Sequence, residues 1–164
     1  MILAIDPGNV ETAYVLIGDD RKPLEFGKVD NETMLEYVLH RFAHGEKPEV
    51  VAIEMVASYG MAVGASVFQT CVMIGRLTEA ARLLGFPVEY VYRMEEKMAI
   101  CHDSKAKDAN IRQALIDRFA QHDFKNGKGT KKNPDWFYGF AKDEWAAYAV
   151  GITHLDKKNG TEKK

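Results

Sequence analysis

The chain has 164 residues and a formal net charge of −2, with 46% apolar and 28% charged residues. This is the composition of an ordinary globular protein, and it excludes disordered, collagen-like and disulfide-rich chains. The length predicts a single domain, the apolar runs are shorter than the ~18 residues of a membrane helix, and no basic signal region precedes them, so we expect a cytoplasmic protein without a membrane partner.

Five short apolar segments bounded by turn residues have the character of β-strands. They are residues 2–5, 12–17, 24–29, 49–55 and 88–92. Apolar residues at helical spacing predict helices at 31–43, 62–84, 94–101, 107–120 and 140–156.

The order of these elements predicts the fold class. Three strands joined by short turns form an antiparallel meander, and the later alternation of helices and strands gives parallel strands with right-handed crossovers. We therefore expect an α/β fold with a mixed five-stranded sheet flanked by helices. One domain would cover residues 1–156, followed by a frayed polar tail at 157–164.

Basic residues are concentrated in one stretch of the chain. Lys and Arg minus Asp and Glu gives −6 for residues 1–91 but +4 for residues 92–132. Such an asymmetry indicates an anionic partner, although charged residues also serve solubility. Within the polar loop at 124–135, four lysines are candidates for phosphate contacts that become ordered on binding. They are Lys125, Lys128, Lys131 and Lys132.

Acidic residues stand at the ends of several predicted elements. Asp6 follows the first strand, Glu54 lies near the end of the fourth, and Asp143 and Glu144 open the last helix. A charge in a buried strand needs a partner or a metal, and open α/β sheets bind ligands at the carboxyl ends of their strands. Turn chemistry at Asp6 and the helix dipole at Asp143 and Glu144 are alternative explanations.

Converging carboxylates without His or Cys are the ligands that Mg²⁺ or Mn²⁺ prefers. Two such ions about 3.5–4 Å apart can clamp the attacking and leaving oxygens of a phosphodiester. The sequence has no zinc-type Cys/His cluster, no Gly-x-Ser-x-Gly elbow and no Gly-x-x-x-x-Gly-Lys-Ser/Thr loop, so we expect no nucleotide cofactor. The pattern predicts a metal-dependent nuclease with two ions in its active site.

Four blocks of the sequence resemble the RuvC-type Holliday junction resolvases of the RNase H-like superfamily. Three are Ile-Asp-Pro-Gly at 5–8, Ile-Glu at 53–54 and Lys-Asp-Glu-Trp-Ala-Ala-Tyr-Ala-Val-Gly-Ile-Thr-His at 142–154. The fourth, Ser-Lys-Ala-Lys-Asp-Ala-Asn-Ile-Arg at 104–112, is similar to phage-type members. The resemblance covers residues 1–156 with the blocks in the family's order.

The resemblance implies an RNase H-like fold and a homodimer that cuts four-way DNA junctions by paired symmetric nicks. The products would carry 5′-phosphates, and the setting would be DNA recombination or repair in a bacterial or phage-infected cell. Asp6, Glu54 and Asp143 map onto the catalytic, metal-binding acids of the family. The family's second acid in the last block is replaced by Ala146, and the adjacent Glu144 is the candidate substitute as a metal ligand.

Other assignments also come from the resemblance. Lys107 is the preferred catalytic lysine near the scissile phosphate, and Tyr59 is a candidate for stacking at the junction centre. The helix at 62–84 is the candidate dimer face. Further basic residues in the positions of DNA contacts are Lys97, Lys105 and Arg112.

Two aromatic features have a structural interpretation. Phe68 is expected in the core, and an aromatic group before the last helix is expected to pack under the basic loop. This group consists of Trp136, Phe137, Tyr138 and Phe140.

Three alternatives to a junction resolvase stay open. Ala146 favours a non-catalytic nucleic-acid-binding protein with the same fold. A nuclease for other branched DNA or for RNA would use the same residues. Asp-Pro-Gly with Thr12 also resembles the phosphate loop of actin-like ATPases, but those proteins close two such domains around ATP, and this chain is long enough for only one.

Overall fold

The computed structural model describes residues 1–58, 60 and 62–161, and the predicted Tyr59 lies outside this range. Its centre is a five-stranded sheet in the order β3-β2-β1-β4-β5. Strands β1, β2 and β3 pair antiparallel, whereas β4 and β5 continue parallel to β1, as the sequence predicted. The strands are Ile2–Pro7, Glu11–Ile17, Pro23–Asp30, Val51–Met55 and Val88–Tyr92.

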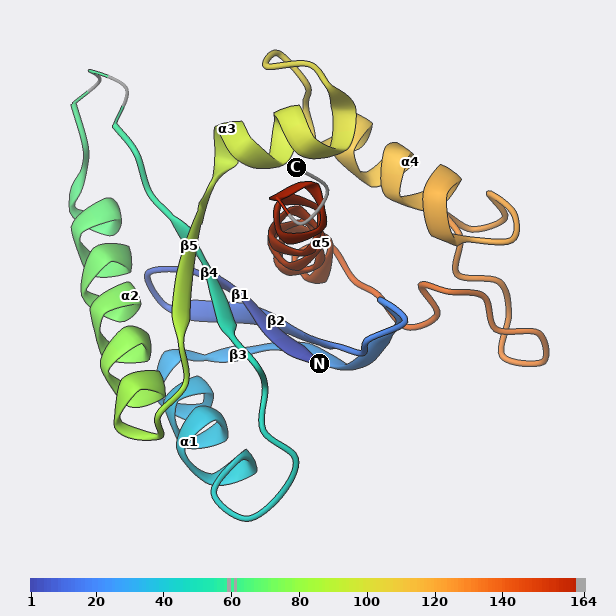
Figure 1. The fold of residues 1–164 in the computed structure, drawn as a ribbon. Coiled ribbons are helices and arrows are strands. Elements are labelled where there is room, and N and C mark those ends of the chain that lie inside the picture. Colours follow the sequence, from blue (N-terminus) through green and yellow to red (C-terminus); the bar gives the residue numbers. More distant parts are fainter. Residues whose placement is uncertain (59, 61, 162–164) are drawn as a thin grey trace.

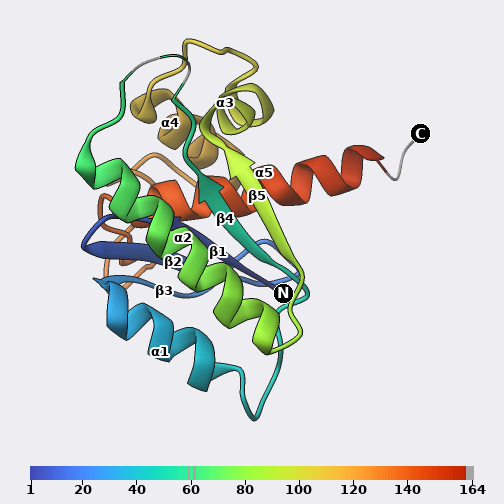
Figure 2. The same cartoon turned by 90° about the vertical axis from the view of Figure 1, so that its left-hand side faces the viewer.

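Helices cover both faces of this sheet (Figure 1). The first face carries α1 (Asn31–Arg41) and α2 (Ala65–Leu83), and the second carries α5 (Glu144–Thr161). Figure 2 shows the same elements after a 90° turn, with α3 (Arg93–Glu96) and α4 (Asp108–Phe119) above α5. None of the helices in the described part of the chain combines the length and apolarity that crossing a membrane requires.

Alternation along β1 divides the core into two clusters, because successive side chains of a strand point to opposite faces. Leu3 and Ile5 pack with residues of α1 and α2. Ile2 and Ala4 pack with α5 and with the aromatic residues before it. Asp6, two positions after Ala4, therefore also faces α5.

The segment between β5 and α4 changes its helical type. Helix α3 (Arg93–Glu96) continues as a π-helix, Lys97–Cys101, which ends at His102 in a left-handed conformation with φ 55°. Helix α4 then runs over Asp108–Phe119. Short π segments are frequent at functional sites.

The last helix lies later in the chain than predicted. It begins at Glu144, where the Glu144 carboxylate accepts a hydrogen bond from the Ala141 N–H at 2.9 Å, and it ends at Thr161. The expected tail is thus helical as far as residue 161. Lys157 bonds Glu95 at 2.7 Å and Lys158 bonds Glu49 at 3.4 Å, which ties this extension to the rest of the protein.

Helix α5 lies unusually close to the sheet at one residue. A Cβ atom at Gly151 would lie 2.3 Å from Ile17 Cδ1 and 2.9 Å from Ala4 Cβ. Real Cβ atoms do not approach other atoms so closely, so this crossing requires glycine.

The expected packing under the basic loop is confirmed for Phe137, whose backbone N–H donates to the Gly127 carbonyl at 3.0 Å. Phe137 and Phe140 are fully buried and pack against Tyr148 of α5. Trp136 is half-buried and its indole N–H donates to Tyr148 Oη at 3.1 Å, whereas Tyr138 is exposed.

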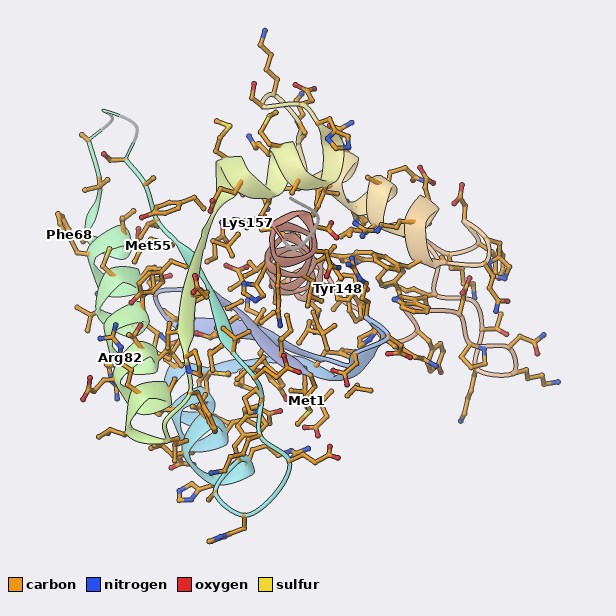
Figure 3. The ribbon with its side chains drawn as sticks, viewed as in Figure 1. Met1, Met55, Phe68, Arg82, Tyr148 and Lys157 are labelled. Atoms are coloured by element: carbon orange, nitrogen blue, oxygen red, sulfur yellow. The ribbon has the colours of Figure 1, made fainter. Side chains whose placement is uncertain are left out.

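The prediction for Phe68 is wrong. It is 61% exposed on α2, and Figure 3 shows it on the side of the helix that faces away from the sheet. Apolar residues lie on both sides of this helix, so the apolar character of Phe68 did not show that it is exposed.

The basic loop before α5 is connected by hydrogen bonds of its own. Asp135 accepts hydrogen bonds from the backbone N–H groups of Gln121, His122 and Trp136 at 2.7–3.3 Å. A β-bridge joins Gly129 to Pro134 across the loop. These contacts connect the two sides of the loop and join it to the end of α4.

Candidate active site

Two acidic residues lie side by side at the carboxyl ends of β1 and β4. Ile5 pairs with Ile53 in the parallel register, so the next residues, Asp6 and Glu54, are neighbours. By strand alternation both face α5, as Ala4 and Ala52 do. The sheet thus holds two carboxylates close together beneath the start of the last helix.

Burial and mutual repulsion disfavour the charged forms of both groups. Burial, the nearby Glu54 charge and a hydrogen bond between the two carboxyl groups raise the pKa of Asp6 to about 8. Burial and the nearby Glu96 charge raise the pKa of Glu54. Two carboxyl groups that share a proton in this way form a site that a cation would stabilise.

A guanidinium group lies against these acids. Arg93 follows β5 directly, and alternation from Val91 directs it to the α5 face. Its Nη1 donates to Glu96 and its Nη2 donates to Asp108 at the start of α4. Burial alone would lower the pKa of Arg93, but the charges of Glu96, Glu54 and Asp108 together raise it.

Glu96 is a fully buried carboxylate in the wall behind this arginine. One oxygen accepts the hydrogen bond from Arg93, and the other has no hydrogen-bond partner among the described residues. Burial raises the pKa of Glu96 to about 7, even though Arg93 acts in the opposite direction. The region therefore contains more buried carboxylates than cations.

Asp143 approaches from the other side of the cavity, in the turn before α5. It is 41% exposed, and the Lys28 ammonium bonds it at 3.0 Å and Glu11 at 2.7 Å. Hydrogen bonds to these two carboxylates raise the pKa of Lys28. Asp143, the third acid predicted for the metal site, is thus already paired with Lys28.

An open cavity of about 310 Å³ joins these groups. A second cavity of about 220 Å³ shares Asp6 and Asp143 with it and extends past Gly8 to Lys28. The larger cavity is lined by Asp6, Glu54, Arg93, Asp108, Ile111, Arg112, Lys142, Asp143, Trp145 and Ala146.

The turn beside Asp6 is held by its own contacts. A Cβ atom at Gly8 would lie 2.3 Å from the Glu11 carbonyl oxygen, so the turn requires glycine there. The Asn31 amide donates to the Gly8 carbonyl at 3.2 Å, and Thr12 donates to Asn31 Oδ1 at 2.8 Å. The side of the cavity next to Asp6 is therefore fixed to the start of α1.

The residues at this site fit a divalent cation at one place. Asp6 and Glu54 provide only oxygen ligands, are partly desolvated and repel each other, which is the chemistry that Mg²⁺ or Mn²⁺ satisfies. Across the residues that the structure describes, no group of three or more His, Cys, Asp or Glu side chains is close enough to hold a metal ion. The acid pair fits the ion, and Asp143 would join only after leaving Lys28.

The structure gives Glu144 a different role from the one expected. Its carboxylate caps the turn before α5 through the Ala141 N–H, and the side chain is buried. It does not belong to the residues that line either cavity at Asp6. We therefore leave Glu144 out of the candidate ligand set.

The predicted basic residues separate into two groups. Arg112 lines the cavity. Lys107 is the N-cap of α4, directly before Asp108, and its exposed side chain is not part of the cavity lining. Six other predicted lysines also lie outside that lining: Lys97, Lys105, Lys125, Lys128, Lys131 and Lys132.

Sequence reasoning missed Arg93, Glu96, Asp108 and Lys142. A signal for Arg93 was present, since it follows a parallel strand just as Asp6 and Glu54 end theirs. Glu96 gave no signal, because its burial depends on how α3 packs over the end of the sheet.

No family model and no curated protein matches this chain. Among solved structures, the chain is similar to Thermus thermophilus RuvC in complex with a Holliday junction substrate, with a TM-score of 0.69 and 19% identity over 98% of this chain and 95% of that one. A second structure of Thermus thermophilus RuvC gives a TM-score of 0.67 and 20% identity, with 98% and 96% covered. The chain therefore has the RuvC-type, RNase H-like fold.

Proposed function

We propose that this protein is a metal-dependent DNA endonuclease that cuts four-way junctions. The observation that carries the proposal is the pair of buried carboxyl groups, Asp6 and Glu54, at the strand ends of this fold. Their raised pKa values mark a site that needs a cation, and Arg112 and Lys142 line the same cavity. A site with both features suits an anionic phosphodiester.

Each group has a defined task in the proposed reaction. Asp6 and Glu54 would hold Mg²⁺ or Mn²⁺, and Asp143 would be available as a further ligand only without its bond to Lys28. The bound ion supplies Lewis acidity, which favours a hydroxide nucleophile and offsets negative charge on the phosphate. Arg112 and Lys142 orient the phosphate at the cavity mouth. The water oxygen bonds to phosphorus, the P–O3′ bond breaks and O3′ takes a proton, leaving a 5′-phosphate.

The remaining basic residues would hold the DNA arms. Lys107 stands next to the cavity at the start of α4, and Lys97 and Lys105 lie on the same connection from β5. On the folded loop, Lys131 and Lys132 are exposed and Lys125 lies over the exposed Phe124 ring. Phosphate contacts from such lysines give affinity without sequence selectivity.

A homodimer is the expected assembly, because a four-way junction has two symmetric strands to cut. Helix α2 supports this part of the proposal with an exposed apolar row. Phe68 and Val72, one helical turn apart, are 61% and 64% exposed. A second copy would cover these side chains and place two cavities on one junction.

A cleavage assay tests the proposal. Labelled four-way junction, linear duplex, single strand and RNA hairpin are incubated with Mg²⁺ or Mn²⁺ and wild-type protein. We expect paired nicks in the junction alone and no cleavage with Asp6→Asn. Glu46→Gln is the matched control, since it also removes one carboxylate charge but lies in an exposed loop after α1.

The assay also separates the competing functions. Tight junction binding with no cleavage under either metal would contradict the nuclease proposal and support a binding protein, as Ala146 in the cavity wall favours. Cleavage of other branched DNA or of RNA would contradict the junction preference alone.

A further inference from the structure

The position of Arg93 among the acids has a consequence for how many metal ions the site holds. The Arg93 side chain is 27% exposed and lines the cavity, and its charge interacts with those of Asp6 and Glu54. It is held by Glu96 from behind and by Asp108 from the rim. The positively charged Arg93 is thus fixed beside Asp6 and Glu54, the carboxylates that would bind a metal.

The carboxylates available for metal ions are few. Asp143 is bonded to Lys28, and Asp108 is bonded to Arg93. Among the described carboxylates that line the cavity, only Asp6 and Glu54 form no direct ion pair. The wall at position 146 contributes a methyl group. One or two carboxylates are the usual protein ligand set for a single Mg²⁺, with substrate oxygens completing the shell.

Arg93 also has donors left for a ligand. A guanidinium carries five N–H donors in a planar fork, and the two carboxylate bonds use one donor on each Nη. Because Glu96 and Asp108 fix the group from two sides, it loses little freedom when it binds a phosphate oxygen. Preorganised donors of this kind are the most effective at stabilising charge that develops in a transition state.

We propose that this site holds one divalent cation, between Asp6 and Glu54, and that Arg93 supplies the second positive charge at the scissile phosphate. The inference rests on the proposed nuclease function and deepens it. It replaces the expectation of two metal ions, and it makes Glu96 a positioning residue for Arg93.

Metal counting without DNA is the first test. Mn²⁺ is titrated into each protein, and free Mn²⁺ is followed by electron paramagnetic resonance. We expect one Mn²⁺ per chain for wild type and for Arg41→Gln, a matched control that removes a guanidinium from an ion pair with Glu25 on the outer surface. Arg93→Gln should bind Mn²⁺ more tightly, because a like charge beside the ion is lost. Ala146→Asp should add a second, weaker ion.

Cleavage kinetics are the second test. Arg93→Gln should lower kcat by about 100-fold, as loss of a preorganised donor does, with little change in junction Kd. Arg93→Lys keeps the charge but not the planar fork, so we expect an intermediate rate. This variant also keeps a cation between Glu96 and Asp108, which guards against a failure to fold.

Specific outcomes would overturn the inference. Two Mn²⁺ ions per wild-type chain would exclude the single-ion site. An Arg93→Gln variant with unchanged Mn²⁺ affinity, or one that cleaves at the wild-type rate, would remove Arg93 from the reaction. Because Mn²⁺ binding is measured without DNA, these results are distinct from a failure of junction cleavage itself.

Discussion

Two charge clusters beside α5 are built in opposite ways. At Asp156, two guanidinium groups surround one carboxylate, with Arg21 at 2.6 Å and Arg118 at 2.6 and 2.7 Å. Burial would raise the pKa of Asp156, but these hydrogen bonds outweigh it and lower the pKa.

At the cavity the balance is reversed. Asp6, Glu54 and Glu96 surround the single guanidinium of Arg93, and all three carboxyl groups have raised pKa values. The Asp156 cluster satisfies its own charges and ties the fold together. The cavity cluster has more carboxyl groups than Arg93 can neutralise, so these groups hold protons or would be stabilised by an added cation.

The largest expected effect comes from Asp6→Asn. Without this metal ligand, the transition state of cleavage would lose several kcal/mol of stabilisation, which corresponds to a cleavage rate about 1000-fold lower. The same change should raise the free energy of unfolding by about 2 kcal/mol without metal, because a repelled buried carboxyl is removed. Rates on labelled junction and urea unfolding in EDTA measure the two effects. A less stable variant would contradict our description of the cavity charge.

A pH series tests the same cluster through stability. The pKa of Asp6 rises from 3.8 to about 8 and that of Glu96 from 4.5 to about 7. Between these values the folded protein holds protons that the unfolded chain has released, so stability falls as pH rises and levels off above about 8. Each group contributes at most about 1.4 kcal/mol per pH unit.

Urea unfolding in EDTA from pH 6.5 to 8 measures this slope. The window avoids most of the opposite contribution of His154, whose pKa burial lowers from 6.5. Asp6→Asn should flatten the profile, and added Mg²⁺ should reduce its slope. A metal-free profile that rises with pH would count against the raised pKa values.

At the second cluster, Asp156→Ala should lower stability by about 2 kcal/mol, since two guanidinium groups lose a half-buried partner. For a chain of this size that corresponds to a decrease in Tm of about 4–8 °C. Junction cleavage and Mn²⁺ binding should stay at wild-type levels. A large loss of cleavage by the folded variant would show that the two clusters are coupled.

The smallest expected effect concerns a lysine of the basic loop, which belongs to neither charge cluster. Lys131→Ala should reduce the slope of log Kd against log salt for junction binding by about 1, the value for one phosphate contact. Fluorescence anisotropy at several salt concentrations measures the slope. Lys47→Ala, in an exposed loop after α1, is the control and should leave it unchanged. Equal slopes for both variants would remove the loop from the DNA path.

The sheet was predictable because its signals are local. Apolar runs of strand length with turn residues between them identified all five strands. The meander followed by helix–strand alternation predicted which strands pair antiparallel and which pair parallel. Asp6, Glu54 and Asp143 were predictable for the same reason, since each stands where a strand ends or a helix starts, and the structure brings them to one cavity.

Features that depend on packing between distant segments were not predictable. Glu96 is buried only because α3 folds over the sheet, and Lys28 reaches Asp143 from the third strand. Glu144 was a candidate ligand by position, but its carboxylate is used by the turn that starts α5. The exposed face of Phe68 depends on which side of α2 meets the sheet, which composition does not encode.

Gly151 sets a limit on how this protein can change. Replacing a helical glycine by alanine ordinarily stabilises a helix by about 1 kcal/mol. Here the added methyl would push α5 away from Ala4 and Ile17. Trp145 and Ala146, about one and a half turns earlier on the same helix, would move with it and change the depth of the cavity over Asp6. We therefore expect Gly151→Ala to destabilise this protein and to alter the cavity, although Gly151 is not part of the cavity lining.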